Sequence, residues 1–152
     1  GIVIKDVFEN VFNQLSFLIG LKKPIIKMDL NKAQIVFLNK SYIESILLNL
    51  MSNSLRYCDP NKQLKISIAS KKIGSETIIT FKDNGIGINE DMREKVFLPS
   101  FTTKNSGTGL GLAMCRQIIE SVNGKIYFIS EINVGTEFIV ELPLMRIEKN
   151  II

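Results

Sequence analysis

Residues 100–112 hold the side chains with the clearest chemistry in this sequence. Lys104 brings a positive charge, Thr102, Thr103 and Thr108 bring hydroxyl donors, and three glycines alternate behind them. Glycine lets backbone amides approach a ligand closely, and the start of a following helix directs further amides at an anion. The stretch predicts a phosphate-binding lid, and a flexible loop that merely precedes a helix is the alternative.

Two common phosphate-binding motifs are excluded by position. A dinucleotide fingerprint that begins at Gly107 would need its third glycine where Leu112 stands. A P-loop would need Gly-Lys-Ser or Gly-Lys-Thr, and neither occurs in the chain.

A second group of polar side chains lies on a segment with helical periodicity. Asn49 and Asn53 are four positions apart, so their amides share one helix face, with Arg56 and Tyr57 one turn further on. Mg²⁺ takes oxygen ligands, keeps several waters and shares substrate phosphates, so one side-chain carbonyl can suffice. We interpret this face as a metal and phosphate site. The alternative is that each amide only satisfies a neighbouring backbone group.

A third group, Asp-Asn-Gly-Ile-Gly-Ile at 83–88, follows directly on an apolar strand. The Asp83 carboxylate could accept a hydrogen bond from an exocyclic amine such as the N6 of adenine. Gly85 and Gly87 would leave room for the flat base. A plain Asn-Gly turn is the alternative.

The elements that must hold these groups mix helices and strands. Helices are expected at 6–18 with Asp6 as cap, at 41–57 behind a capping box, at 91–96 and at 110–122. Strands are expected at 25–30, 34–38, 64–69, 77–81, 125–130 and 136–142. Phe97 and Phe101 are expected to pack and to hinge the lid. Because strict βαβ alternation is missing, a single mixed sheet covered on one face by helices is the economical packing.

The composition is that of one ordinary globular domain over residues 1–152. Hydrophobic residues make up 45% and charged residues 22% of the chain, and no apolar run is long enough to span a bilayer. The net charge of +4 is mild and argues against a nucleic-acid partner. The chain has no histidine, which removes histidine-based acid–base chemistry and any phosphohistidine from this polypeptide. The two cysteines fit no metal or redox spacing and are expected to be reduced.

Four segments, in order, resemble the motifs of sensor histidine kinases of two-component systems. Residues 49–57 are similar to their N box, 83–87 to the G1 box, 97–101 to the F box and 107–112 to the G2 box. Residues 135–143 resemble the last strand of the same module. The resemblance implies the Bergerat-type α/β sandwich shared with gyrase, the ninety-kilodalton heat-shock chaperone and the MutL ATPases. That fold has a mixed, mostly antiparallel sheet covered on one face by three main helices, with a short ATP lid.

The resemblance also implies a role for each residue of an ATP site. Asn53 would hold Mg²⁺ between the phosphates, Asn49 would support the metal or its water, and Lys104 would meet the β- and γ-phosphates. Asp83 would accept from the adenine amine, with Thr136 beside it through water. The remaining implied contacts are Arg56, Tyr57, Gly85, Gly87, Ile88, Thr102, Thr103, Gly107, Thr108, Gly109, Leu110, Gly111 and Leu112. Ser54, where relatives usually carry Ala, and Ser100 are small departures.

The implied function is that of an ATP-binding catalytic domain that donates the γ-phosphate of Mg-ATP to a histidine elsewhere. A gyrase- or chaperone-type ATPase would instead carry a glutamate general base at position 49, where an amide stands here. A serine-directed anti-sigma kinase fits the F box and the short lid poorly. A module that binds ATP without transferring it is the non-enzymatic alternative.

The resemblance implies two partners, the phosphoacceptor/dimerisation domain of the same kinase and the receiver domain of a response regulator. We expect this fragment to be monomeric and the full-length kinase to be a homodimer. The expected location is cytoplasmic, with any membrane attachment made through regions outside this chain.

Overall fold

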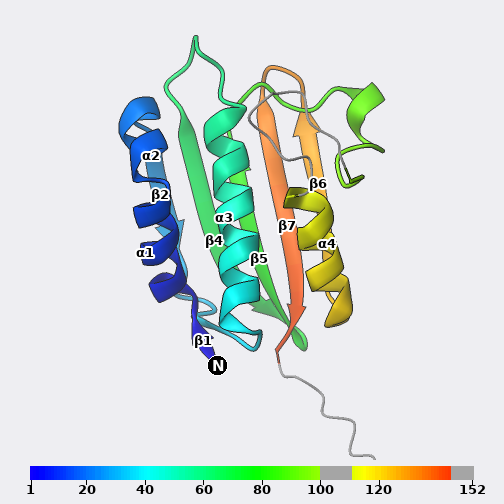
Figure 1. The fold of residues 1–152 in the computed structure, drawn as a ribbon. Helices are drawn as coiled ribbons and strands as arrows, with labels where there is room; N and C mark the ends of the chain where they lie inside the picture. The colour runs from blue at the N-terminus through cyan, green and yellow to red at the C-terminus, as the bar shows by residue number, and fades with distance from the viewer. Residues whose placement is uncertain (100–110, 145–152) are drawn as a thin grey trace, which may run out of the picture.

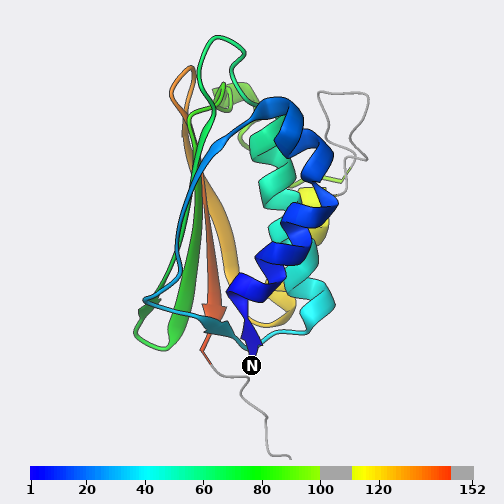
Figure 2. The same cartoon turned by 90° about the vertical axis from the view of Figure 1, so that its left-hand side faces the viewer.

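The protein is known from a computed structural model that describes residues 1–99 and 111–144. The described chain forms two layers, a twisted sheet and a layer of helices that covers one of its faces (Figure 1, Figure 2). This arrangement confirms the predicted α/β sandwich. Most of the predicted lid, residues 100–110, lies outside the described residues.

The main sheet has five strands in the order β2-β4-β5-β7-β6. β2 runs parallel to β4 and the other neighbours are antiparallel, as predicted for a mixed sheet. The central β5–β7 pairing places Asp83 opposite Thr136. The strands are β2 (Ile25–Asp29), β4 (Lys65–Ile73), β5 (Glu76–Asp83), β6 (Lys125–Glu131) and β7 (Gly135–Pro143).

The amino-terminal helix differs from its prediction at both ends. β1 (Ile2–Val3) pairs with β3 (Ile35–Val36) in a two-stranded ladder outside the main sheet. β3 is shorter than the strand predicted at 34–38. Because this ladder holds Val3 extended, α1 (Ile4–Gln14) starts directly from it, and Asp6 lies in the first turn instead of capping the helix. The helix breaks at Leu15, and α2 (Ser16–Lys22) follows.

The long helix α3 (Lys40–Arg56) carries the N-box residues. The predicted capping box is wrong, because Asn39 is the N-cap and its Oδ1 accepts from the Ser41 amide at 2.9 Å. Glu44, the second residue of the predicted capping box, instead accepts from the side-chain Nε2 of Gln14 at 2.6 Å. The end of the helix is as predicted, with Tyr57 as the C-cap.

The last helix follows its prediction closely, whereas the short helix predicted before the lid does not. α4 (Gly111–Ser121) ends at Ser121, and the turn that follows contains Asn123, with a φ of 62°, and Gly124, the pair predicted to stop the helix. The helix predicted at 91–96 is only a 3₁₀ turn, η1 (Glu90–Met92), with Asn89 as its cap.

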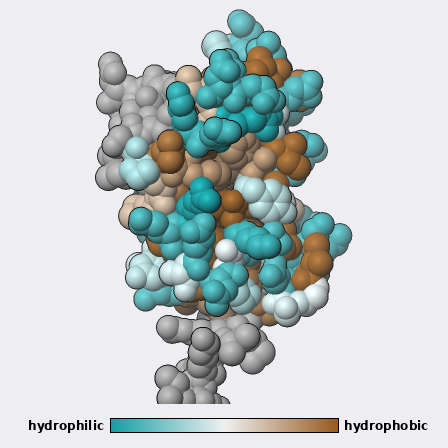
Figure 3. Space-filling model, turned by 90° about the vertical axis from the view of Figure 1, so that its right-hand side faces the viewer, coloured by the Kyte–Doolittle hydropathy of each residue, from teal (hydrophilic) through white to brown (hydrophobic). Residues whose placement is uncertain are grey.

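The surface of the described residues is mixed in character. Figure 3 shows the side formed by the β6 edge and α4, where hydrophobic residues lie in separate patches among hydrophilic ones. No helix among residues 1–99 and 111–144 is long and apolar enough to cross a bilayer.

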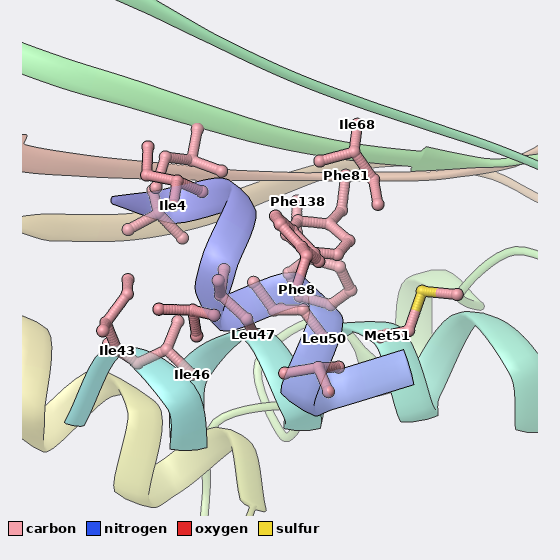
Figure 4. Packing of buried hydrophobic residues seen from close by; sticks show 14 of the residues in the cluster. Ile4, Phe8, Ile43, Ile46, Leu47, Leu50, Met51, Ile68, Phe81 and Phe138 are labelled. Carbon is pink, nitrogen blue, oxygen red and sulfur yellow. The ribbon is translucent and has the colours of Figure 1, made fainter. Parts of the chain in front are cut away.

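The core lies between the sheet and helices α1 and α3 (Figure 4). Phe8 of α1 meets Phe81 of β5 with their ring centroids 5.7 Å apart, and both side chains are fully buried. Leu47, Leu50 and Met51 of α3 are fully buried as well. Because each such side chain contributes about 1.5–3 kcal/mol on burial, this packing fixes which face of α3 points toward the sheet.

Candidate functional site

The Asp83 carboxylate is held by donors from three parts of the fold. Its Oδ1 accepts from the Gly85 amide at 2.9 Å and from the Thr136 amide of β7 at 3.3 Å. Its Oδ2 accepts from the Ser54 hydroxyl of α3 at 3.1 Å. The carboxylate at the end of β5 therefore points into the helical side of the sheet with a fixed orientation.

Burial raises the pKa of the Asp83 carboxyl above its ordinary range. The hydrogen bonds from Gly85, Ser54 and Thr136 oppose that rise and stabilise the charged form. A carboxylate in such a poorly solvated place would form a charge-assisted hydrogen bond with a ligand donor, and bonds of that kind are stronger than neutral ones.

The two asparagines lie on α3, as predicted, but their surroundings differ from each other. The Asn49 Nδ2 donates to the Ser45 carbonyl at 2.8 Å, which leaves its Oδ1 facing the start of α4. A methyl group added at Gly111 would lie 2.3 Å from that oxygen. Asn53 is half-buried one turn further on, ahead of Arg56 and Tyr57. The structure thus brings one face of α3 and the last lid glycine together.

The two G1-box glycines are required by close backbone packing, which the sequence alone did not predict. A Cβ at Gly85 would lie 2.4 Å from the Tyr57 carbonyl oxygen. At Gly87, where φ is 78°, it would lie 2.3 Å from the Glu131 carbonyl oxygen. At both positions the space that a side chain would need is therefore occupied by backbone. Both glycines let the loop after β5 pack tightly between α3 and β6.

Thr136 lies beside Asp83, but its hydroxyl is turned to another partner. The Oγ1 of Thr136 is 2.8 Å from the Oγ of Ser130 on β6. Ser130 also accepts from the Ile88 amide at 2.8 Å, so it ties β6, β7 and the G1 loop together. The sequence argument missed Ser130, although it follows Ile126 and Phe128 on the core-facing side of a strand, where a buried hydroxyl needs a partner.

Phe97 packs as predicted. Its ring lies 5.9 Å from Phe128 and 6.4 Å from Phe138, centroid to centroid. The guanidiniums of Arg116 and Arg93 lie over the Phe97 and Phe128 rings at 5.6 and 5.7 Å. This cluster fastens the segment before the lid to the sheet. Phe101 lies outside the described residues, as do the lid contacts predicted from Thr102 to Leu110.

A hollow of about 600 Å³ lies on the opposite, helix-free face of the sheet. Its lining includes the outward-facing side chains of Lys65, Lys82 and Glu137. Asp83, Ser130 and Thr136 also border it, at the end of the sheet where the two faces meet. The Asp83 carboxylate itself accepts from the Ser54 hydroxyl of α3, on the helical side. We therefore place the candidate site on the helical side, where Asp83 and the two asparagines lie.

Comparisons with known proteins agree with this geometry. The chain belongs to the family of histidine kinase-, DNA gyrase B- and HSP90-like ATPases, whose profile matches residues 39–146. Within that family it is an ATP-binding catalytic domain of the histidine kinase type.

One sequence relative and two structures of a second kinase illustrate the likeness. Sporulation kinase D of Bacillus subtilis is 37% identical over 105 residues, which cover 69% of this chain and 20% of that kinase. The catalytic domain of histidine kinase ThkA superposes with a TM-score of 0.80 at 30% identity, covering 94% of this chain and 93% of that domain. ThkA in complex with the response regulator TrrA matches with a TM-score of 0.78 at 25% identity, covering 97% of this chain and 42% of that one. The chain thus spans about a fifth of the length of the sporulation kinase.

Proposed function

We propose that this domain binds Mg-ATP and donates its γ-phosphate to a histidine on a separate dimerisation domain. The observation that carries the proposal is the pairing of a half-buried, oriented carboxylate at Asp83 with an amide at position 49. The first suits adenine recognition. The second cannot take a proton from water, which separates this site from ATPases that use a glutamate base.

The residues fit a magnesium–nucleotide complex by their chemistry. Amide oxygens are hard ligands of the kind Mg²⁺ prefers, and Asn53 is half-buried on the same helix as Asn49. When bound, the metal would neutralise phosphate charge, and phosphoryl transfer depends mainly on such neutralisation and on positioning. Asn53 would hold the metal, and Asn49 would orient its water and pack against the start of α4. Lys104 and the lid amides would contact the phosphates.

The downstream partner follows from the same proposal. The related kinase ThkA has been solved in complex with a response regulator. We propose that the parent of this domain likewise passes phosphate from its histidine to an aspartate of a receiver domain. The parent would be a homodimer through its dimerisation helices.

Asn53→Ala tests the proposal. The variant should lose transfer to a supplied histidine-bearing dimerisation domain and lose the magnesium dependence of ADP affinity. It should still bind metal-free nucleotide, because Asp83 is untouched. The measurements are radiolabel transfer and thermal melting with ADP, with and without Mg²⁺. Asn61→Ala, in the exposed loop after α3, is the matched control. A magnesium increment as large in Asn53→Ala as in the parent would contradict the ligand role.

A further inference from the structure

Ser54 stands at a buried position of α3 where the sequence pattern calls for an apolar residue. It follows Leu47 and Leu50 at helical spacing, and its side chain is only 3% exposed. A hydroxyl in such a place must find a partner, because an unsatisfied buried polar group costs about 1–3 kcal/mol. The identity of that partner decides what the residue does.

The partner is not the one a helix normally offers. A serine inside a helix commonly donates to the carbonyl four residues earlier. Ser54 instead donates across the layer to Asp83 Oδ2 at 3.1 Å. The serine therefore serves the carboxylate and not its own helix.

The two oxygens of Asp83 are used unequally. Oδ1 accepts from two backbone amides, those of Gly85 and Thr136. Among the described residues, Oδ2 accepts from Ser54 alone. Since a carboxylate oxygen can accept more than one bond, Oδ2 is the oxygen with capacity left for a ligand. The hydrogen bond from Ser54 fixes the orientation of Oδ2, and with it the direction from which a ligand donor can approach.

We infer that Ser54 is a positioning residue that orients Asp83 Oδ2 toward the exocyclic amine of a purine nucleotide and so sharpens selection for adenine. The inference rests on the proposed nucleotide function. It assigns to this chain a selectivity contact that an alanine at the same place could not make.

The test compares two ligands that differ in one group. ADP carries the 6-amino group, and purine riboside 5′-diphosphate lacks it. Ser54→Ala should lower ADP affinity roughly two- to tenfold, the range of one net hydrogen bond, and leave the affinity for purine riboside diphosphate unchanged. In an Asp83→Ala background the same change should have no further effect on ADP, because the two residues act as one unit. Titration calorimetry gives both affinities.

Ser52→Ala is the matched control, since Ser52 is a buried serine on the same helix and has no hydrogen bond to Asp83 among the described residues. It should leave the ratio of the two affinities as in the parent protein. If Ser54→Ala weakens both ligands equally, the role is structural and the inference is overturned, while the nucleotide function stands. If the parent itself does not prefer ADP over purine riboside diphosphate, both the adenine contact of Asp83 and the inference fall.

Discussion

Asp83 meets two opposing demands at the scale of a single residue. Ligand recognition favours a charged carboxylate, whereas burial disfavours the charge and raises the pKa. The donors from Gly85, Ser54 and Thr136 offset part of this conflict. In the unliganded domain the residue therefore stores an unfavourable charge that a ligand donor can relieve.

The sign of the pKa shift makes a prediction for Asp83→Asn. The raised pKa means that the folded state binds the Asp83 proton more tightly than the unfolded chain does. The free energy of unfolding therefore falls as the pH rises from the ordinary carboxyl range through the raised pKa of Asp83. At neutral pH the nucleotide-free variant should therefore melt at the same temperature as the parent or higher, with a flatter pH dependence. ADP affinity should nevertheless fall roughly ten- to a hundredfold, because the charge-assisted bond is lost.

Thermal melting across pH and titration with ADP check both halves of this prediction. Asp91→Asn, an exposed carboxylate on η1, is the control and should change neither quantity. Asp83→Ala should weaken binding further. A variant that loses stability and affinity together at neutral pH would contradict the predicted opposition.

Single residues also show where sequence reasoning reached its limit. The site residues Asn49, Asn53 and Asp83 could be placed from spacing alone, because helix and strand periods fix which face a residue occupies. The close packing of Gly85 could not be predicted in this way, because it involves the Tyr57 carbonyl at the end of a different element. The bond from Ser54 to Asp83 likewise joins residues that lie far apart in sequence.

At the scale of elements, α3 and α4 meet at Asn49 and Gly111, and we propose that this contact couples the proposed metal ligands on α3 to the predicted lid. Gly111 is the first residue of α4, and it packs against the Asn49 amide oxygen. The helix-forming pattern of 110–122 did not reveal this contact, because the pattern describes one helix and the contact belongs to two. The same limit explains why the caps of α1 and α3 were predicted wrongly. The start of α1 is fixed by the β1–β3 ladder, and the start of α3 is fixed by the Asn39 side chain.

Gly111→Ala tests this coupling. The new methyl group would lie 2.3 Å from Asn49 Oδ1, so the side chain or the helix must shift. We expect a loss of about 1–3 kcal/mol in unfolding free energy, the usual range for overpacking, together with weaker binding of Mg-ADP. The double variant Asn49→Ala/Gly111→Ala should recover the stability, because the obstructing amide is gone.

The matched control is Gly20→Ala on α2, where an added Cβ meets nothing within 4 Å. That change should leave binding unaltered and stabilise the fold by roughly 0.4–1 kcal/mol, as expected for alanine in a helix. Denaturant unfolding and ADP titration measure both effects. Equal behaviour of the two glycine variants would show that the α3–α4 contact has no role.

At the scale of the whole molecule, the chain has a candidate nucleotide site but no histidine to receive the phosphate. Its sequence contains no histidine, and position 49 is an amide. We therefore expect the isolated domain to bind Mg-ATP without labelling itself and without appreciable hydrolysis. Incubation with γ-labelled ATP, followed by acid and base treatment of any label, is the measurement. A stable stoichiometric phosphoprotein would contradict the proposed division of labour.

The order of the sheet has a consequence for how this domain can change. Two local hairpins, β4–β5 and β6–β7, join in the middle of the sheet through β5 and β7. Phe97 and Gly111, which flank the predicted lid in the sequence, each pack against this frame. Loop-closure entropy grows with the logarithm of length, so doubling a loop costs about 0.6 kcal/mol. We therefore expect that insertions or deletions between these two positions would alter the proposed phosphate contacts and cost the described sheet and helices little stability.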